Sequence, residues 1–180
     1  MKTAFFDVDT QLDFLYPAGA LYVPGAERIV PLIAQLNRYA AAHSIPIVST
    51  VDAHFEDDPE FQVWPKHCVA GTLGQHKAAA TLIAGAQQFI VEKQTVDVFQ
   101  CPALLPLIES LAPERVVVYG VVTEICVLYA VRGLVRMGKQ VIVVSDAIQS
   151  LTADGSRAAL EEMRSAGARI ESANAPHRDW

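Results

Sequence analysis

Three side chains in this 180-residue chain have the chemistry needed for covalent catalysis, and each follows a different apolar segment. Cys126 carries a thiol that can act as a nucleophile, Asp9 a carboxylate that can move a proton, and Lys93 a cation that can stabilise negative charge. A thiol nucleophile needs a base, and no histidine follows the apolar segments that precede these three residues. The sequence therefore indicates an Asp–Lys–Cys set.

Each of these residues also has an ordinary structural alternative. A cysteine is most often a small buried core residue, the carboxylate could cap a turn, and the lysine could be solvated at the surface. The case for Cys126 is its position, because Thr123 is the predicted N-cap of a helix. Cys126 would then lie in the first helical turn, where free N–H groups and the helix dipole favour a thiolate. Cys68 and Cys101 have no such setting and are interpreted as structural.

A second group of residues has the composition of a metal site. Asp52 and His54 are followed by Glu60 and His67, and two imidazoles with one or two carboxylates suit Zn²⁺, Mn²⁺ or Fe²⁺. Ordinary hydrogen bonding within a loop is the alternative, because the spacing is loose. Asp58 is close enough in sequence to compete with Glu60 as a ligand. Three further histidines belong to no motif and are expected at the surface: His43, His76 and His177.

These residues can meet only if the chain folds into a sheet, and its apolar segments predict one. Six short runs rich in valine and isoleucine do not alternate with polar residues, as expected for strands buried on both faces. The predicted strands are Thr3–Val8, Pro46–Val51, Gln88–Glu92, Arg115–Val118, Gln140–Ser145 and Arg169–Ser172. The predicted helices are Glu27–His43, Pro102–Leu111, Glu124–Met137 and Ala153–Ala166.

The alternation of strands and helices predicts an α/β fold over residues 1–180. We expect one domain with an open parallel sheet of about six strands and helices on both faces. In such a sheet ligands bind at the carboxyl ends of the strands, so the candidate residues should converge along one edge. Residues 52–85 predict a long irregular loop inserted at this edge, and long loops in compact domains are usually functional.

Composition and charge exclude several classes of protein. A net charge of −6 argues against nucleic acid or an anionic membrane surface as partners. No run approaches the roughly 18 apolar residues of a membrane span, and Asp7 comes too early for a secretory signal. Three cysteines, an odd number, indicate a reduced, cytoplasmic protein. The dinucleotide, P-loop and G-x-S-x-G motifs are absent.

Longer motifs resemble those of a known family over nearly the whole chain. Residues 9–14 (DTQLDF) are similar to the opening D-x-Q-x-D-F motif of the isochorismatase-like cysteine hydrolases. Residues 120–127 resemble the segment that carries the nucleophile in that family. Asp52 with His54, and residues 64–72 (WPKHCVAGT), resemble the metal-binding segments of its nicotinamidases.

The resemblance implies a role for each candidate catalytic residue. Cys126 would be the nucleophile, Asp9 the general acid and base, and Lys93 the third catalytic member. The Val121–Val122 peptide would be a cis bond. The backbone N–H groups of Val122 and Cys126 would form the oxyanion hole.

The resemblance also implies one divalent metal ion, with zinc as the first choice and iron or manganese as alternatives. Asp52, His54 and His67 match metal ligands of nicotinamidases. Glu60 stands in the region where many nicotinamidases have a third histidine, which leaves Glu60 and Asp58 as alternatives for the fourth ligand.

The pocket residues implied by the resemblance bear on the substrate. Phe14 and Trp64 match aromatic residues that line the substrate pocket. Leu12, Gln94 and residues 124–125 differ from the usual residues of the family. Because these positions neighbour the pocket, they affect substrate identity more than reaction class.

The function expected from the resemblance is hydrolysis of nicotinamide to nicotinate and ammonia through a cysteine thioester, a step of NAD salvage. One alternative is a related cysteine hydrolase that acts on another small amide or on a carbamoyl compound. An alternative of another class is a metal- or ligand-binding protein without turnover. The expected partner is the small amide, and the family is often oligomeric, so a homo-oligomer is expected.

Overall fold

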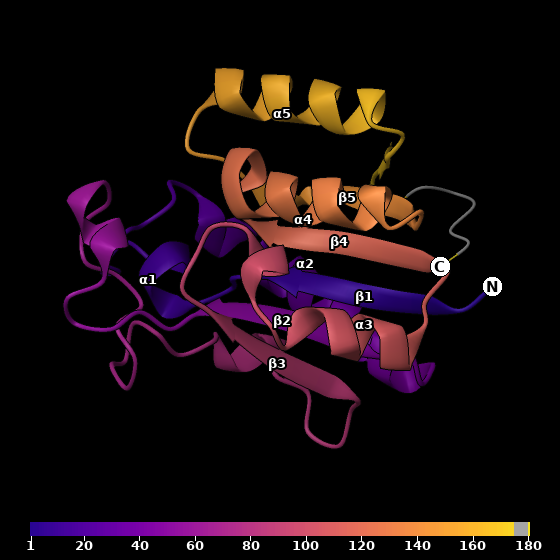
Figure 1. Ribbon diagram of the computed structural model, residues 1–180, viewed down its shortest axis with the longest axis horizontal. Helices are drawn as coiled ribbons and strands as arrows, with labels where there is room; N and C mark the ends of the chain where they lie inside the picture. Colours follow the sequence, from indigo (N-terminus) through magenta and orange to yellow (C-terminus); the bar gives the residue numbers. More distant parts are fainter. Residues whose placement is uncertain (175–179) are drawn as a thin grey trace.

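A six-stranded parallel sheet forms the middle layer of the molecule (Figure 1). The structure is a computed structural model that describes residues 1–174 and 180. The strand order is β3-β2-β1-β4-β5-β6, and every neighbouring pair is parallel. The strands are β1 Thr3–Val8, β2 Ile47–Asp52, β3 Gln88–Lys93, β4 Arg115–Val121, β5 Gln140–Gln149 and β6 Arg169–Glu171. The predicted α/β fold with an open parallel sheet is confirmed.

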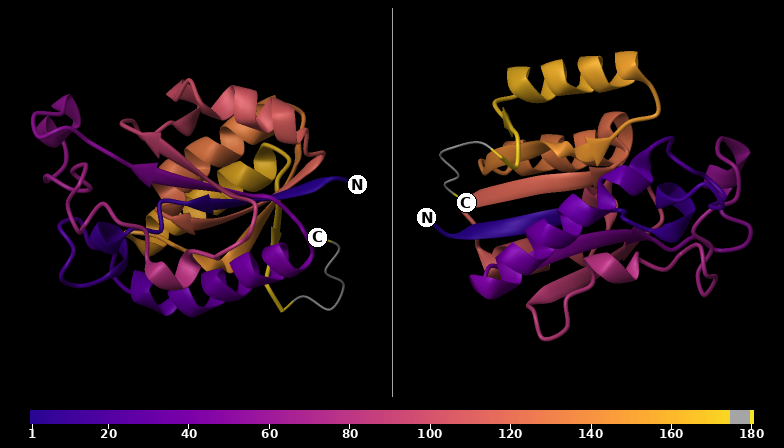
Figure 2. Two further views of the ribbon diagram at one scale, coloured as in Figure 1. Left: turned by 90° about the horizontal axis from the view of Figure 1, so that it is seen from below. Right: turned by 180° about the vertical axis from the view of Figure 1, so that it is seen from behind.

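Helices cover both faces of this sheet. The helices are α1 Leu12–Leu15, α2 Val30–Ala42, α3 Leu104–Leu111, α4 Leu128–Arg136 and α5 Ala153–Ser165. Helix α2 lies on one face, α3 and α4 lie on the other, and α5 packs against α4 (Figure 2). Among the described residues, no helix is both long enough and apolar enough to cross a membrane.

The central strands are buried on both faces, as their apolar runs predicted. Every residue of β1, β2 and β4 is buried. The edge strand β3 differs, because Phe89 and Ile90 are exposed there. Strands β4 and β5 are also longer than predicted. A register shift between Val118 and Gly120 lets the two strands resume pairing beyond the apolar runs. The polar residues 145–146 interrupt the apolar pattern, so the continuation of β5 was not predicted.

Three of the predicted helices change at their N-termini. The first predicted helix is split into a 3-10 turn at Ala26–Arg28 and α2, which has a proline in its first turn. Helix α3 begins at Leu104, two residues later than predicted. The segment before α4 is a π-turn at Thr123–Val127. The four-residue helix α1 was not predicted, because it is too short to show a periodic pattern.

Gly120 is required where β4 passes the end of β1. Its φ is +122°, and a Cβ atom there would lie 2.1 Å from the carbonyl oxygen of Val8, its direct pairing partner. We expect Gly120→Ala to lower the free energy of unfolding by roughly 2–5 kcal/mol, since it adds a backbone clash to an unfavourable φ. Urea unfolding measures this loss. Gly138→Ala is the control, with φ +72° but nothing within 4 Å, and should cost about 1 kcal/mol. Equal losses in the two variants would contradict the clash.

Candidate active site

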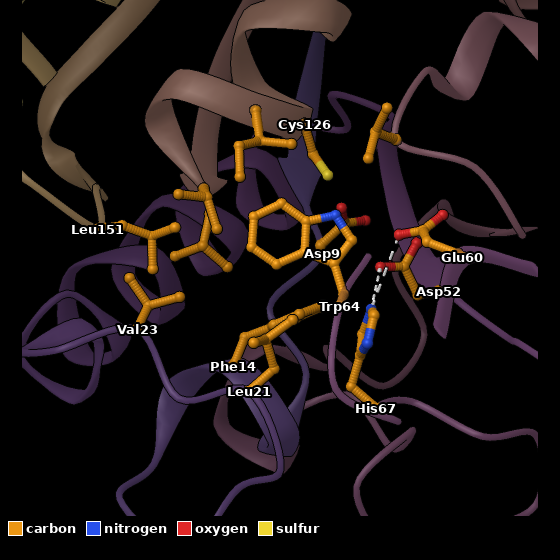
Figure 3. A pocket seen from close by; sticks show the side chains of 14 residues that line it. Asp9, Phe14, Leu21, Val23, Asp52, Glu60, Trp64, His67, Cys126 and Leu151 are labelled. Carbon is orange, nitrogen blue, oxygen red and sulfur yellow. Dashed lines mark ion pairs between the residues drawn. The ribbon is translucent and has the colours of Figure 1, made fainter. Parts of the chain in front are cut away.

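The carboxyl ends of four strands bring the candidate residues together at one edge of the sheet (Figure 3). Asp9 follows β1, Asp52 ends β2, Lys93 ends β3 and Cys126 lies in the turn after β4. These strands are neighbours in the sheet, so the convergence predicted from the topology is what the structure shows.

Lys93 is the centre of the contacts among these side chains. Its Nζ lies 2.9 Å from Oδ2 of Asp9 and 3.7 Å from Sγ of Cys126, and it also forms an ion pair with Oδ1 of Asp52. Lys93 is 3% exposed and Asp9 is 1% exposed. The alternative of a solvated surface lysine is therefore excluded.

Burial and neighbouring charges shift the pKa values of Lys93 and Asp9 in opposite directions. Burial lowers the pKa of Lys93, but the carboxylates of Asp52 and Asp9 outweigh it, and the pKa lies well above its ordinary value. Burial raises the pKa of Asp9, and the nearby Lys93 opposes that shift. The lysine is therefore a permanent cation, and the Asp9 carboxyl can hold a proton more readily than an exposed aspartate.

Asp9 keeps one oxygen available toward the thiol. Its Oδ1 accepts a hydrogen bond of 2.5 Å from Oγ1 of Thr50, which orients the carboxylate. Its Oδ2 faces Lys93 as an ion pair, but it accepts no hydrogen bond within the described part of the chain. The backbone of Asp9 has a φ of +49°, a left-handed conformation that aspartate tolerates better than most residues.

Cys126 lies in a π-turn, where an ordinary helical turn was predicted. The N–H groups of Ile125 and Val127 both donate to the carbonyl oxygen of Val122, at 3.0 and 3.1 Å. Neither bond uses the N–H of Cys126, which lies between them. Thr123 is the first residue of the turn, Val122 is its N-cap, and Oγ1 of Thr123 has no hydrogen-bond partner in the described part of the chain, so the N-cap prediction was wrong. The predicted cis peptide at Val121–Val122 is confirmed.

The thiol of Cys126 is not held as a thiolate by its helix. Burial raises the pKa of Cys126 well above its ordinary value, and the carboxylates of Asp9 and Asp52 add to this shift, while Lys93 opposes it. The expectation of a thiolate favoured by the helix N-terminus is therefore not met. A base must remove the proton, and Asp9 is beside it.

A cavity that is open to solvent lies over the thiol, and its empty space, part of the open solvent included, is about 410 Å³. Phe14 and Trp64 both line it. One end is polar, with Asp52, Glu60 and His67 (Figure 3). Val23 and Leu151 lie at the opposite, aliphatic end (Figure 3), and Leu21 and Ile125 also line the cavity. Among the described residues, no lysine or arginine lines this cavity.

Three of the predicted metal-binding residues converge at the polar end. One ligand atom from each of Asp52, His54 and His67 lies within 4.8 Å of the other two. Oδ2 of Asp52 is 3.8 Å from Nε2 of both histidines, which exceeds hydrogen-bond distance. Nδ1 of His67 lies 2.7 Å from the carbonyl oxygen of Pro65, so this nitrogen donates and Nε2 is left as an acceptor.

The ring of His54 has the same arrangement, with Nδ1 bound to an oxygen atom and Nε2 left over. Its Nδ1 lies 3.0 Å from Oδ2 of Asp58. Its Nε2 is buried and has no hydrogen-bond partner among the described residues. A buried ring nitrogen without a partner, facing an aspartate and a second imidazole, is what a metal ion would satisfy. The residues present therefore fit a divalent metal ion.

Asp58 and Glu60 take different places around this cluster. Both oxygens of Asp58 have protein partners, because Oδ2 faces His54 and Oδ1 accepts from the N–H of Glu60. Glu60 lines the cavity, with Oε1 4.0 Å from Nε2 of His67. The geometry therefore makes Asp58 an orienting partner of His54 through Nδ1, whereas Glu60 faces the Nε2 atom of His67 that is left as an acceptor. His54 and Asp58 are four residues apart in a segment that is not helical, so their spacing was no signal for this contact.

Other residues singled out from the sequence lie away from the cavity. His43 and His76 are exposed, and His177 lies outside the described residues. Cys68 is buried and Cys101 is half-buried, and neither lines the cavity. Leu151 was missed as a wall of the pocket, although it follows the fifth strand, where topology places ligand-contacting residues.

A parallel sheet that carries a buried thiol, a carboxylate and a lysine at its carboxyl edge is the architecture of an α/β cysteine hydrolase. The family model of the isochorismatase domain matches residues 3–175 of the chain. The chain belongs to the isochorismatase family, and it is a hydrolase that acts on amide bonds.

Relatives with named activities support this assignment. A nicotinamidase/pyrazinamidase from Mycobacterium tuberculosis is 30% identical and covers 93% of this chain and 97% of its own. The crystal structure of pyrazinamidase from Pyrococcus horikoshii in complex with zinc matches with a TM-score of 0.88 at 30% identity, over 96% of this chain and 99% of that one. A nicotinamidase from Bacillus subtilis matches with a TM-score of 0.89 at 25% identity, over 96% and 100%.

Proposed function

We propose that this protein hydrolyses nicotinamide to nicotinate and ammonia through a thioester on Cys126. The observation that carries the proposal is one cavity with a thiol on its wall and, at its polar end, Asp52 and His67 of the Asp–His–His cluster. A neutral pyridine amide can present its carboxamide to the thiol and its ring nitrogen to the Asp–His–His cluster. The relatives named nicotinamidase and pyrazinamidase support the same substrate class.

A second candidate is hydrolysis of another small amide or of a carbamoyl compound. Many carbamoyl compounds carry a carboxylate, and a buried carboxylate needs a cation or several donors. Because no lysine or arginine of the described chain lines the cavity, its walls favour a neutral aromatic amide. We also propose that the protein is cytoplasmic, forms a homo-oligomer and acts in NAD salvage. The family resemblance supports these three points.

We propose that Asp52, His54 and His67 hold one divalent ion, with Glu60 as a further ligand directly or through water. Zinc is the first choice, because two imidazoles and carboxylates suit it and the pyrazinamidase of Pyrococcus horikoshii was solved with zinc. Bound there, the ion would supply a Lewis-acid site for the ring nitrogen and so orient the pyridine ring.

The chain's own residues would carry out the acylation. Asp9 takes the proton of the Cys126 thiol, and the sulfur attacks the carboxamide carbon. The N–H groups of Val122 and Cys126 stabilise the resulting oxyanion, and the cation of Lys93 stabilises the negative charge nearby. Asp9 then gives its proton to the leaving nitrogen, ammonia departs, and a thioester remains on Cys126.

Deacylation would use the same carboxylate in the opposite role. Asp9 removes a proton from a water molecule, and the water oxygen attacks the thioester carbon. The carbon–sulfur bond breaks, nicotinate leaves, and the proton returns to the sulfur of Cys126. The raised pKa of Asp9 supports this double role, because the carboxyl must hold the proton between the two transfers.

The decisive experiment is to incubate the purified chain with nicotinamide and to measure ammonia and nicotinate. Equal amounts of the two products support the proposal. Turnover of other small amides without turnover of nicotinamide would favour the second candidate. Tight binding of Zn²⁺ without turnover of any amide would instead favour a binding protein.

Trp64 is expected to act in binding more than in chemistry, because it lines the cavity but contributes no reacting atom. We expect Trp64→Ala to raise KM for nicotinamide about 10-fold through loss of an aromatic wall, and to change kcat by less than about 3-fold. Steady-state kinetics separates the two constants. Val63→Ala is the control, since Val63 is 77% exposed beside it and should leave both constants unchanged. A large fall in kcat with an unchanged KM would contradict the binding role.

A further inference from the structure

Gln11 is a fully buried side chain that the reaction scheme above does not use. It lies two residues beyond Asp9, after the end of β1. Its Nε2 donates to the carbonyl oxygens of Asp52 at 2.7 Å and of Gln75 at 2.8 Å. Its Oε1 accepts from the N–H of Asp52, also at 2.7 Å. One amide side chain therefore binds both backbone groups of Asp52.

These bonds replace sheet pairing at the point where the sheet stops. The ladder between β1 and β2 ends at the pair Val8 and Thr50, two residues before Asp52. Beyond it, the side chain of Gln11 supplies the donor and the acceptor that a neighbouring strand would otherwise offer to Asp52. The direction of the Asp52 side chain is set by this backbone segment.

Asp52 is the residue that the candidate metal cluster shares with the catalytic group. Its Oδ2 faces His54 and His67, and its Oδ1 contacts Lys93, which in turn pairs with Asp9. A small rotation of Asp52 would therefore change both the ligand set and the charge around the lysine.

Asp13, two residues after Gln11, holds the loop that carries His67, the other cavity-lining member of the metal cluster. Oδ2 of Asp13 accepts from the N–H of Cys68 at 2.7 Å, directly after His67. Oδ1 of Asp13 accepts from the N–H of Ala20 at 2.9 Å. Gln11 thus ties the end of β2 to the segment after β1, and Asp13, in α1, ties the loop that carries His67 to the same region.

We propose that Gln11 is a positioning residue that holds Asp52 for metal binding, so that the metal cluster and the Asp9–Lys93 pair keep one geometry. The inference rests on the metal site of the proposed function. It assigns to Gln11 no contact with the substrate or with the ion. The expected effect is therefore on metal affinity, with activity changing as a consequence.

The test is Gln11→Met, which keeps the approximate volume and removes all three hydrogen bonds. The dissociation constant for Zn²⁺, measured by chelator competition, should rise about 10- to 100-fold, the range seen when outer partners of metal ligands are removed. The visible spectrum of the Co²⁺-loaded variant should also change, because the ligand geometry relaxes. Neither readout depends on turnover of an amide.

Gln88 offers a matched control on β3. Its Nε2 donates to Oγ of Ser49 and to the carbonyl oxygen of Thr81, and its Oε1 accepts from the N–H of Ile83, at 2.9, 3.1 and 3.0 Å. None of these partners belongs to the candidate metal cluster. Gln88→Met should therefore lower the melting temperature but change the Zn²⁺ dissociation constant by less than about 2-fold.

Each outcome bears on one of the two proposals. If the unmodified chain binds no Zn²⁺, the metal site of the proposed function fails. If it binds Zn²⁺ and Gln11→Met binds equally well, or if Gln88→Met weakens binding as much, only the positioning role is overturned. If Gln11→Met does not fold, Gln11→Glu decides the question. That variant keeps the acceptor for the N–H of Asp52 and loses both donors, and its Zn²⁺ dissociation constant should still rise about 10-fold.

Discussion

Cys126→Ala is expected to lower kcat for nicotinamide hydrolysis by about 10⁶-fold, the scale seen when a covalent nucleophile is removed. The variant loses the attacking atom, and neither Asp9 nor Lys93 can replace it. The fold should remain intact, since alanine fills most of the space of a residue that is 8% exposed. Ammonia release measures the activity, and urea unfolding measures the stability.

Two further variants test whether the loss is specific to the thiol of Cys126. One changes another cysteine, and the other replaces the sulfur of Cys126 by oxygen. Cys101→Ala should keep full activity, because Cys101 does not line the cavity. Cys126→Ser should be nearly inactive, because Asp9 is a weak base for an alcohol. Mass spectrometry of the quenched, unmodified chain should find an acyl group on Cys126. Substantial turnover by Cys126→Ala would exclude the covalent mechanism.

Chelator-treated protein is expected to lose kcat/KM for nicotinamide by about 100-fold or more, because the ring would no longer be oriented over the thiol. The rate at which iodoacetamide alkylates Cys126 should change little, since the small reagent needs no orientation. Elemental analysis of protein purified without chelator should find one divalent ion per chain. His67→Ala should behave like the chelated protein, whereas His76→Ala is the control at an exposed histidine.

Benzamide provides the complementary test on the substrate side. It has the size and carboxamide of nicotinamide but lacks the ring nitrogen, so its kcat/KM should be lower by about 100-fold. Chelation should reduce benzamide hydrolysis only slightly, because there is no nitrogen to hold. Equal hydrolysis of the two amides, or full nicotinamide turnover by metal-free protein, would remove the orienting role. The hypothesis of a related cysteine hydrolase with another small amide as substrate would then replace the proposed nicotinamidase function.

The amino-acid sequence was enough to predict the sheet and the edge at which the candidate catalytic residues gather. Non-alternating runs of valine and isoleucine are buried on both faces, and strands of that kind with helices between them pair in parallel. The carboxyl ends of parallel strands lie at one edge, so Asp9, Lys93 and Cys126 were expected along that edge. The observed strand order, β3-β2-β1-β4, then brings them into contact. The conformation at Val121–Val122 was also expected, from the resemblance of its segment to a known motif.

The contacts that each side chain makes became visible in the folded chain and could not be predicted from sequence spacing. Sequence spacing left Asp58 and Glu60 as alternatives, and the fold directs Asp58 to Nδ1 of His54. It also replaced the predicted N-cap of Thr123 by a π-turn, and it assigned the side chain of Gln11 to the backbone of Asp52. The physical reason is that periodic burial reports only local geometry. The loop at 52–85 has no periodicity, and several of its hydrogen bonds join residues some 40 to 70 positions apart, whose meeting depends on the packed sheet.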